Sequence, residues 1–211
     1  MFTAFGVLLG LWTLILIVDG EARFSLIILA IASFIDTVDG TLARKADVNK
    51  HAPEIDGALL DNIVDYLVWV FLPVVWAYYF LDLPFLAGSA VLISSLFGFS
   101  HKGAKTEAYF FRGFPSFWNL VVLYLYVLGA EPLFTTVVML VLAALVHAPM
   151  KFVYPSRTVQ WRKLTLYLSL PYSAMLIVML VYMDETPLWF TIASFYYPIY
   201  YVIVSLLLAK R

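Results

Sequence analysis

The sequence predicts an all-α fold: a polytopic integral membrane bundle of about eight transmembrane helices with both termini in the cytoplasm. Composition, the length of the apolar runs and the distribution of charge all support this prediction. Of the 211 residues, 64% are hydrophobic and 13% are charged, and the mean hydropathy is +0.93. A soluble domain cannot bury that much apolar surface, so the composition indicates a membrane protein.

Eight apolar runs are each close to the roughly 20 residues that a helix needs to cross about 30 Å of hydrocarbon, although some are a little short. Backbone in lipid must satisfy its own hydrogen bonds, and the alternation typical of barrel strands is absent from the sequence, so we expect helices. The expected spans are 2–18, 24–42, 57–80, 83–100, 115–129, 132–147, 164–183 and 187–209.

The connectors between these runs alternate in charge. One set is short and acidic, with Arg23 as its only cation: 19–23, 81–84, 129–132 and 183–187. The other set holds the remaining twelve of the 13 Lys and Arg residues: 44–56, 101–113, 150–163 and the C-terminal 209–211. Because cytoplasmic loops carry an excess of Lys and Arg, this second set and both termini are expected in the cytoplasm.

We expect one domain over residues 1–211, because no linker, low-complexity segment or internal repeat divides the chain. The absence of cysteine excludes disulfides and thiolate metal sites. No basic segment precedes the first apolar run and no small-residue cleavage site follows it, so we expect no signal peptide. That run begins at residue 2, so we allow for a short cytoplasmic leader ahead of it.

Four aspartates lie in two neighbouring apolar runs. Asp36 and Asp39 are three residues apart, and Asp61 and Asp65 are four apart, so each pair shares one helix face. A short loop joins the two runs, which can therefore pack antiparallel with the acidic faces opposed. Small residues beside the acids would allow close approach of the two backbones; they are Gly40, Ala43, Gly57 and Ala58.

Four carboxylates close to hydrocarbon require a neutralising charge, since each unpaired one costs at least about 2.5 kcal/mol. Arg44 alone is too little, and hard divalent cations with oxygen ligands fit this donor set. Zinc is not expected, because His51 has no second histidine nearby. Asp56 has a simpler explanation as the N-cap of the third span.

A metal held beside glycine and arginine at a membrane face indicates phosphate chemistry. The metal and Arg44 would hold phosphate oxygens, Gly40 would permit close approach, and one carboxylate would remain as a base. A phosphate carried on a lipid would reach this depth sideways from the inner leaflet. The residues therefore favour an enzyme that acts on a lipid-linked phosphate.

The acidic motif resembles the signature of the CDP-alcohol phosphatidyltransferases. The matching residues keep the signature's local spacing; they are Asp36, Asp39, Gly40, Ala43, Arg44, Gly57, Asp61 and Asp65. Twelve residues separate Arg44 from Gly57, which is longer than the family's usual spacer. This longer spacer, the eight expected spans and the segment 113–119 are similar to the bacterial phosphatidylcholine synthase branch of that family.

The resemblance implies roles for the matching residues. The four aspartates Asp36, Asp39, Asp61 and Asp65 would bind Mn²⁺ or Mg²⁺, and Asp65 would also be the catalytic base. The CDP group would be lined by Gly40, Ala43, Arg44 and Gly57. The implied reaction joins CDP-diacylglycerol and choline to give phosphatidylcholine and CMP. It would take place in a bacterial inner membrane, with the active site facing the cytoplasm, and the family implies a homodimer.

Choline carries a quaternary ammonium, which aromatic faces bind, with a carboxylate as a possible counter-charge. The aromatic candidates are Tyr66, Trp69, Tyr109, Phe110, Phe111 and Trp118, of which Tyr66 and Trp118 are the preferred pair. The acidic candidates are Glu54 and Glu107. Aromatic residues make up 18% of the chain, and those near span ends are more often interfacial, so the alternative for each is a membrane-interface residue.

Three cations in the cytoplasmic connectors are candidates for completing a pyrophosphate clamp: Lys105, Arg112 and Lys151. The alternative is that they are ordinary basic residues beside anionic lipid. Two other functions stay open. One is transfer to a different acceptor, such as serine, inositol or glycerol phosphate. The other is divalent-metal transport, although a transport site is expected near the midplane of the membrane.

Overall fold

The computed structural model describes residues 2–45, 54, 56–101, 110–154, 158 and 160–209. Within these ranges it describes the side chains of all residues except 2, 3, 38–45 and 209. The candidate residues Lys105, Tyr109 and Glu107 therefore lie outside the described residues, as do the side chains of Asp39, Gly40, Ala43 and Arg44.

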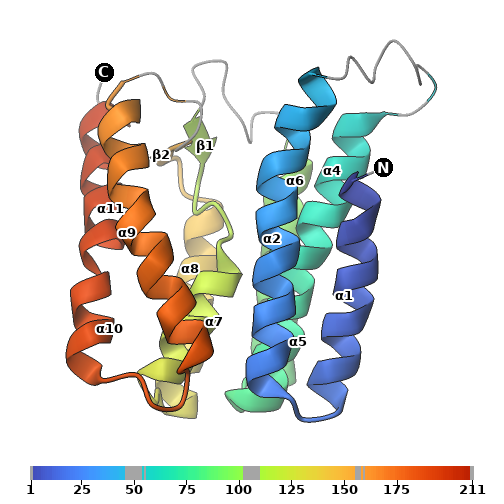
Figure 1. The fold of residues 1–211 in the computed structure, drawn as a ribbon, viewed down its shortest axis with the longest axis vertical. Coiled ribbons are helices and arrows are strands. Elements are labelled where there is room, and N and C mark those ends of the chain that lie inside the picture. The colour runs from blue at the N-terminus through green and yellow to red at the C-terminus, as the bar shows by residue number, and fades with distance from the viewer. Residues whose placement is uncertain are drawn as a thin grey trace.

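The described chain is mostly helical, as the sequence predicts, and the helices run side by side along the long axis of the molecule (Figure 1). The helices are α1 (Phe2–Val18), α2 (Ala22–Lys45), α4 (Gly57–Asp65), the π-helix η1 (Tyr66–Phe71), α5 (Leu72–Phe80), α6 (Phe85–Ser100), α7 (Trp118–Val127), α8 (Pro132–Val146), α9 (Arg162–Val181), α10 (Leu188–Ser194) and α11 (Tyr196–Ala209). Each expected span overlaps at least one of these helices, and α2 and α9 begin two residues before the spans expected for them.

Among the described residues, three helices are long and apolar enough to cross a membrane: Gly57–Phe80, Arg162–Val181 and Leu188–Leu208. Four shorter helices are also apolar: Ala4–Val18, Phe85–Ser100, Trp118–Val127 and Pro132–Val146. The helical class is therefore confirmed, while the count of eight spans and the location of the termini stay predictions.

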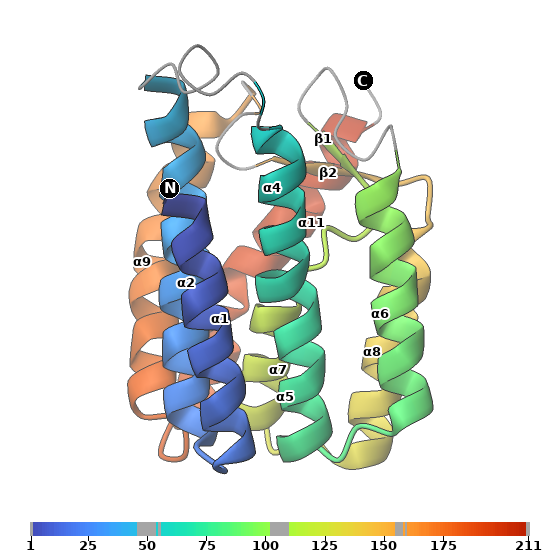
Figure 2. The same cartoon turned by 90° about the vertical axis from the view of Figure 1, so that its right-hand side faces the viewer.

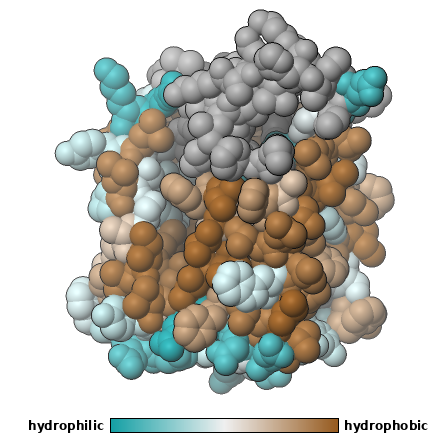
Figure 3. Space-filling model, turned by 45° about the vertical axis from the view of Figure 1, so that its right-hand side comes forward, coloured by the Kyte–Doolittle hydropathy of each residue, from teal (hydrophilic) through white to brown (hydrophobic). Residues whose placement is uncertain are grey.

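The lateral surface is apolar. Figure 3 shows hydrophobic side chains over the middle of one face and polar side chains gathered at its lower edge. Large apolar residues are strongly exposed on several helices, including Leu86 at 80%, Leu133 at 75% and Tyr167 at 76%. Lipid is the environment in which such a surface is stable, so the chain is an integral membrane protein.

A short β ribbon was not expected from the sequence, which indicated only connectors in these places. Strand β1 (Phe110–Arg112) pairs antiparallel with β2 (Lys151–Val153), and Arg112 lies opposite Lys151. Helix α11 anchors the ribbon: the Val153 N–H donates to Ser205 Oγ at 3.0 Å, and the Tyr201 hydroxyl donates to the Val153 carbonyl at 2.8 Å. The ribbon lies toward the same end of the bundle as both ends of the chain (Figures 1 and 2).

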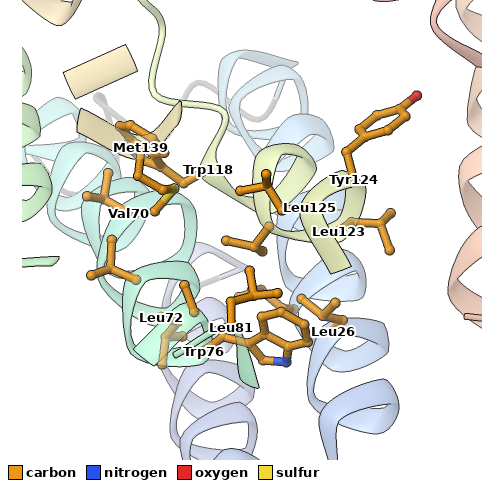
Figure 4. Close-up of a cluster of buried hydrophobic side chains, with 14 of the residues drawn as sticks. Leu26, Val70, Leu72, Trp76, Leu81, Trp118, Leu123, Tyr124, Leu125 and Met139 are labelled. Carbon is orange, nitrogen blue, oxygen red and sulfur yellow. The ribbon is translucent and has the colours of Figure 1, made fainter. Parts of the chain in front are cut away.

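The interior is packed around two fully buried tryptophans, Trp76 and Trp118 (Figure 4). The Trp76 indole N–H donates to Ser25 Oγ at 3.0 Å, and the Trp118 N–H donates to Ser95 Oγ at 2.9 Å. A buried donor without an acceptor costs about 1–3 kcal/mol, so these bonds are required for the rings to be buried at all. They also fix α5 against α2 and α7 against α6.

Gly113 is the residue at which the chain leaves the ribbon toward α7. Its φ is +76°, a left-handed conformation, and its N–H donates to the Met150 carbonyl at 2.8 Å. A Cβ at this position would overlap the backbone carbonyl of Val146 at the end of α8. Only glycine fits both the backbone conformation and the space, so this contact sets how closely the ribbon approaches α8.

We expect Gly113→Ala to destabilise the protein more than Gly129→Ala. Gly129 also has a positive φ, of +60°, but nothing among the described residues lies within 4 Å of a Cβ built there. Gly129→Ala is the control, and its free energy of unfolding should fall only by the conformational cost of about 1–2 kcal/mol. That of Gly113→Ala should fall further, because its Cβ must also displace backbone. Melting temperatures in detergent measure the difference, at about 2–4 °C per kcal/mol. Equal losses would contradict the tight contact.

Candidate active site

Three of the four motif aspartates come together in the structure. Asp36 on α2 and Asp61 and Asp65 on α4 each offer a carboxylate oxygen, and these atoms lie within 4.8 Å of one another. All three residues are partly buried. The spacing of the acids in the sequence predicted this convergence, because residues four apart share a helix face and α2 packs against the rod that contains α4, η1 and α5.

The rest of the motif lies around this cluster. Helix α2 continues through the positions of Asp39, Gly40, Ala43 and Arg44, although nothing further is described for their side chains. Gly57 begins α4, and among the described residues nothing lies within 4 Å of a Cβ built on it. The backbone is therefore open to approach at Gly57.

Asp56 caps α4, the simpler explanation expected from the sequence. Its Oδ1 accepts hydrogen bonds from the N–H groups of Ala58 and Leu59, both at 3.0 Å. Its side chain is exposed. Two backbone donors that have no partner within the helix are satisfied in this way.

The cluster fits a hard divalent cation. Oδ2 of Asp36 accepts a hydrogen bond from the Trp69 indole N–H at 3.2 Å, while its Oδ1 is buried and has no hydrogen-bond partner among the described residues. A buried carboxylate oxygen in this state is costly unless a positive group compensates it. Several carboxylate oxygens, with neither sulfur nor imidazole in the group, suit Mg²⁺, Mn²⁺ or Ca²⁺.

Two of the three clamp candidates lie opposite each other on the ribbon. Arg112 and Lys151 are register partners, and both side chains are exposed. Like charges directly opposite on a β pair repel, so this pair favours an anion between or beside the two side chains. Lys105, the third candidate, lies outside the described residues.

A cavity of about 340 Å³ lies between α4, α6 and the ribbon. Asn62, which lies between Asp61 and Asp65 in the sequence, lines it together with Arg112. Its other lining residues are Gly98, Phe99, Ser100, His101, Phe111, Phe114, Pro115, Ser116 and Val146. The cavity therefore adjoins α4 beside the acidic cluster and has both aromatic and polar walls.

A second cavity, of about 490 Å³, lies between α2, α7 and α9 and is almost entirely apolar. Leucine and isoleucine side chains line most of it, and the residues with polar side-chain atoms in its wall are Ser33, Thr37, Trp69, Asn119 and Ser173. Asn119 donates to Ser33 Oγ at 2.7 Å, and Trp69 is the residue whose N–H reaches Asp36. Trp69 thus connects the apolar cavity to the acidic cluster.

Comparison with known proteins agrees with this geometry. The sequence model described as CDP-alcohol phosphatidyltransferase matches residues 1–152 of the 211. The chain belongs to the CDP-alcohol phosphatidyltransferase family. The match extends from α1 into β2, so α9, α10 and α11 lie beyond it. Membership in a family of transferases argues against the metal-transporter alternative.

Three relatives share much of the chain, and each is named phosphatidylcholine synthase. The one from Pseudomonas aeruginosa is 41% identical over 168 residues, which cover 78% of this chain and 71% of the relative. The one from Borreliella burgdorferi is 39% identical over 174 residues, covering 81% and 74%. The one from Brucella melitensis is 35% identical over 195 residues, covering 90% and 70%.

Within this phosphatidyltransferase, the preferred choline pair does not come together as expected. Trp118 is 0% exposed, and its N–H is bound to Ser95, so neither ring face is open to a ligand. Tyr66 is partly buried, its hydroxyl donates to the Leu92 carbonyl at 2.9 Å, and its ring packs edge-on against Phe99. The burial of Trp118 thus contradicts the prediction that it contacts choline. Tyr66 contacts Phe99, which lines the smaller cavity.

The other choline candidates lie in different parts of the structure. Glu54 is exposed in a turn before α4, and Phe110 lies in a small buried cluster with α11. Phe111 lines the smaller cavity and packs against Tyr154 at 4.6 Å between ring centroids. Tyr109 and Glu107 lie outside the described residues.

Sequence reasoning missed several residues of the site. Asn62, Phe117 and Asn119 belong to the walls and packing around the acidic cluster. For Asn62 the signal was its place between two motif aspartates. Phe117 and Asn119 lie in the family-like segment 113–119, but nothing in that segment singled them out, and 18% of the residues in the chain are aromatic.

We expect Asp61→Asn to weaken Mn²⁺ binding by more than about a hundredfold, since even groups that support a ligand typically contribute 10–100-fold. Asp56→Asn is the matched control: it removes the same charge a few residues away, and asparagine caps a helix as well as aspartate does. Isothermal titration of the purified protein with Mn²⁺ compares the two. Similar affinities for both variants would argue against the cluster as the metal site.

Proposed function

We propose that this chain transfers the phosphatidyl group of CDP-diacylglycerol to choline, forming phosphatidylcholine and releasing CMP. The observation that carries the proposal is the convergence of Asp36, Asp61 and Asp65 in a member of this family. The relatives from Pseudomonas aeruginosa and Borreliella burgdorferi, named phosphatidylcholine synthase, support choline as the acceptor.

Asp36, Asp61 and Asp65, together with Asp39 one helical turn further along α2, would hold Mn²⁺ or Mg²⁺. When bound, the cation supplies positive charge that stabilises the phosphate oxygens and the departing CMP. The small residues Gly40, Ala43 and Gly57 would let the CDP group approach the backbone, and Arg44 would bind its phosphates.

Asp65 is proposed as the general base. The choline hydroxyl is a weak nucleophile until its proton is removed, and a carboxylate within hydrogen-bond reach can accept that proton during attack. The choline oxygen then forms a bond to the phosphorus that carries diacylglycerol, the bond from that phosphorus to the CMP oxygen breaks, and the proton stays on Asp65. Asp65 lies at the last turn of α4, with Asp61 one turn before it.

The two cavities suit two different substrates. The apolar cavity between α2, α7 and α9 matches an acyl chain, and Trp69 and Thr37 place it beside Asp36. The smaller cavity beside α4 has the rings of Phe99, Phe111 and Phe114 in its walls, which suit a quaternary ammonium. Choline bound there, with Tyr66 packed behind Phe99, would present its hydroxyl toward α4.

Arg112 and Lys151 are proposed to bind the pyrophosphate of CDP-diacylglycerol. Their register on the ribbon brings two cations to the end of the bundle at which α4 begins (Figure 1). Arg112 also lines the cavity that contains Asn62 of α4. An anion held there would relieve the repulsion between the two side chains.

The orientation in the membrane belongs to the same proposal. Eight spans, with both termini and the ribbon in the cytoplasm, agree with the basic residues at this end and the acidic connectors of Asp82 and Asp184. The active site would then face the cytoplasm from a bacterial inner membrane. A single domain and a homodimer are carried forward as predictions from the sequence and the family.

Another acceptor is the second candidate, and the pair of Arg112 and Lys151 is the observation that favours it. A phosphorylated acceptor such as glycerol phosphate needs a cationic pocket, which these residues would supply. Serine and inositol carry no quaternary ammonium, so the aromatic walls of the smaller cavity favour them less than choline.

The proposal predicts that choline supports CMP release from CDP-diacylglycerol far better than the other acceptors do. Purified protein with Mn²⁺ or Mg²⁺ is assayed with choline, serine, inositol and glycerol phosphate in turn, and both CMP and the lipid product are quantified. Chelation of the metal should abolish release with every acceptor. A preference for glycerol phosphate would instead support the second candidate, and no release with any acceptor would overturn transferase activity on this donor.

Asp65→Asn is expected to lower turnover by about 10²–10⁴-fold, the usual contribution of a general base. Binding of CDP-diacylglycerol should remain measurable, because Arg44, Arg112 and Lys151 are also proposed to bind its phosphates. Asp82→Asn, in an acidic connector at the opposite end, is the control and should keep wild-type turnover. Wild-type activity in Asp65→Asn would remove this residue from the mechanism.

A further inference from the structure

Trp69 was a choline candidate because it is aromatic and lies one turn beyond Asp65, but its contacts indicate another role. Its indole N–H donates to Oδ2 of Asp36 at 3.2 Å, joining η1 to α2 across 33 residues of sequence. One edge of the ring therefore binds a carboxylate of the acidic cluster. A donor to Oδ2 restricts rotation of that carboxylate about its last bond.

The second oxygen of the same carboxylate completes the observation. Oδ1 of Asp36 is buried and accepts no hydrogen bond from the described residues. With Oδ2 held by Trp69, Oδ1 is the oxygen of Asp36 left available to a cation. The carboxylate is thus fixed on one side and open on the other, which is the usual arrangement of a ligand supported by an outer hydrogen bond.

The helix that carries Trp69 changes its winding at this place. Residues Tyr66–Phe71 form a π-helix directly after Asp65, and the Leu72 N–H donates to the Leu67 carbonyl, five residues back. The wider turn rotates the residues after Asp65 relative to an uninterrupted α-helix. Such turns recur at functional sites, and here the turn carries the indole that reaches Asp36.

The ring of Trp69 also packs against an aromatic neighbour. Phe117, just before α7, packs against it with 5.9 Å between ring centroids and an interplanar angle of 59°. The ring also lines the apolar cavity with Thr37 and Asn119. Packing on the ring fixes the direction of the N–H, so the hydrogen bond to Asp36 does not depend on a freely rotating group.

We propose that Trp69 is a positioning residue, which orients the Asp36 carboxylate for divalent cation binding through its indole N–H. This inference rests on the metal site of the proposed function and assigns Trp69 to the metal rather than to choline. Positioning of the Asp36 carboxylate requires the indole N–H, whereas a choline contact would require only the aromatic face. The two roles therefore separate when the N–H is removed and an aromatic ring is kept.

The test is Mn²⁺ binding by the purified full chain in detergent, followed by the electron paramagnetic resonance signal of free Mn²⁺. Trp69→Phe should raise the Mn²⁺ dissociation constant by about 10–100-fold, the usual effect of losing an outer hydrogen bond to a metal ligand. In the same variant, the KM for choline measured at saturating Mn²⁺ should be unchanged.

Trp76→Phe is the matched control. Trp76 lies on α5 of the same rod, and its N–H also donates to α2, at Ser25 Oγ, away from the acidic cluster. This variant should lose melting temperature in the absence of metal but keep wild-type Mn²⁺ affinity. Equal weakening in both variants, or wild-type affinity in Trp69→Phe, would overturn the role of Trp69.

A second substitution keeps the test decisive if Trp69→Phe does not fold. Benzothienylalanine at position 69 keeps the shape of tryptophan and has sulfur in place of the indole N–H, so the ring packing on Phe117 is preserved. It should weaken Mn²⁺ binding as phenylalanine does, and wild-type affinity would overturn the inference. If the unsubstituted chain binds no Mn²⁺, the proposed metal site itself fails, and the role of Trp69 fails with it.

Discussion

The structure depends on holding several carboxylates together at the edge of hydrocarbon. Like charges at this depth repel, and they persist only where the fold fixes them and an opposite charge can compensate them. Asp36, Asp61 and Asp65 meet because α2 packs against a single rod made of α4, η1 and α5. Hydrogen bonds donated by Trp69 and Trp76 join this rod to α2 at two levels. The acidic cluster and the packing of these helices are therefore one structural feature.

Two cavities of different polarity lie beside the acidic cluster. An apolar cavity adjoins Asp36 through Trp69, and a cavity with polar and aromatic walls adjoins α4 through Asn62. The ribbon, with Arg112 opposite Lys151, lies at the end of the bundle where α4 begins. This difference in polarity between the two cavities suits the proposed transfer from a lipid to a water-soluble acceptor.

Regular structure is interrupted where the site is built. The π-helix η1 follows Asp65 directly, and Gly113 adopts a positive φ where the ribbon meets α8. Both departures are local costs that the surrounding packing compensates. The first bears on the direction of Trp69, and the second on how closely Arg112 approaches the bundle. Neither could be exchanged for ideal geometry without moving a residue of the site.

The sequence by itself determined the helical class, the approximate helices and the cap at Asp56. It also predicted that four aspartates converge, and the structure brings together the three whose side chains it describes. These features rest on local signals: apolar runs of span length, spacings of three or four on one face, and a capping side chain. Only the tertiary structure decided that Trp118 is buried, that Trp69 binds Asp36 and that Arg112 faces Lys151. Those contacts join residues about 20 to 40 positions apart, and strands of three residues carry no periodic signal. Partners that far apart are chosen by packing of the whole chain, which no short stretch of sequence encodes.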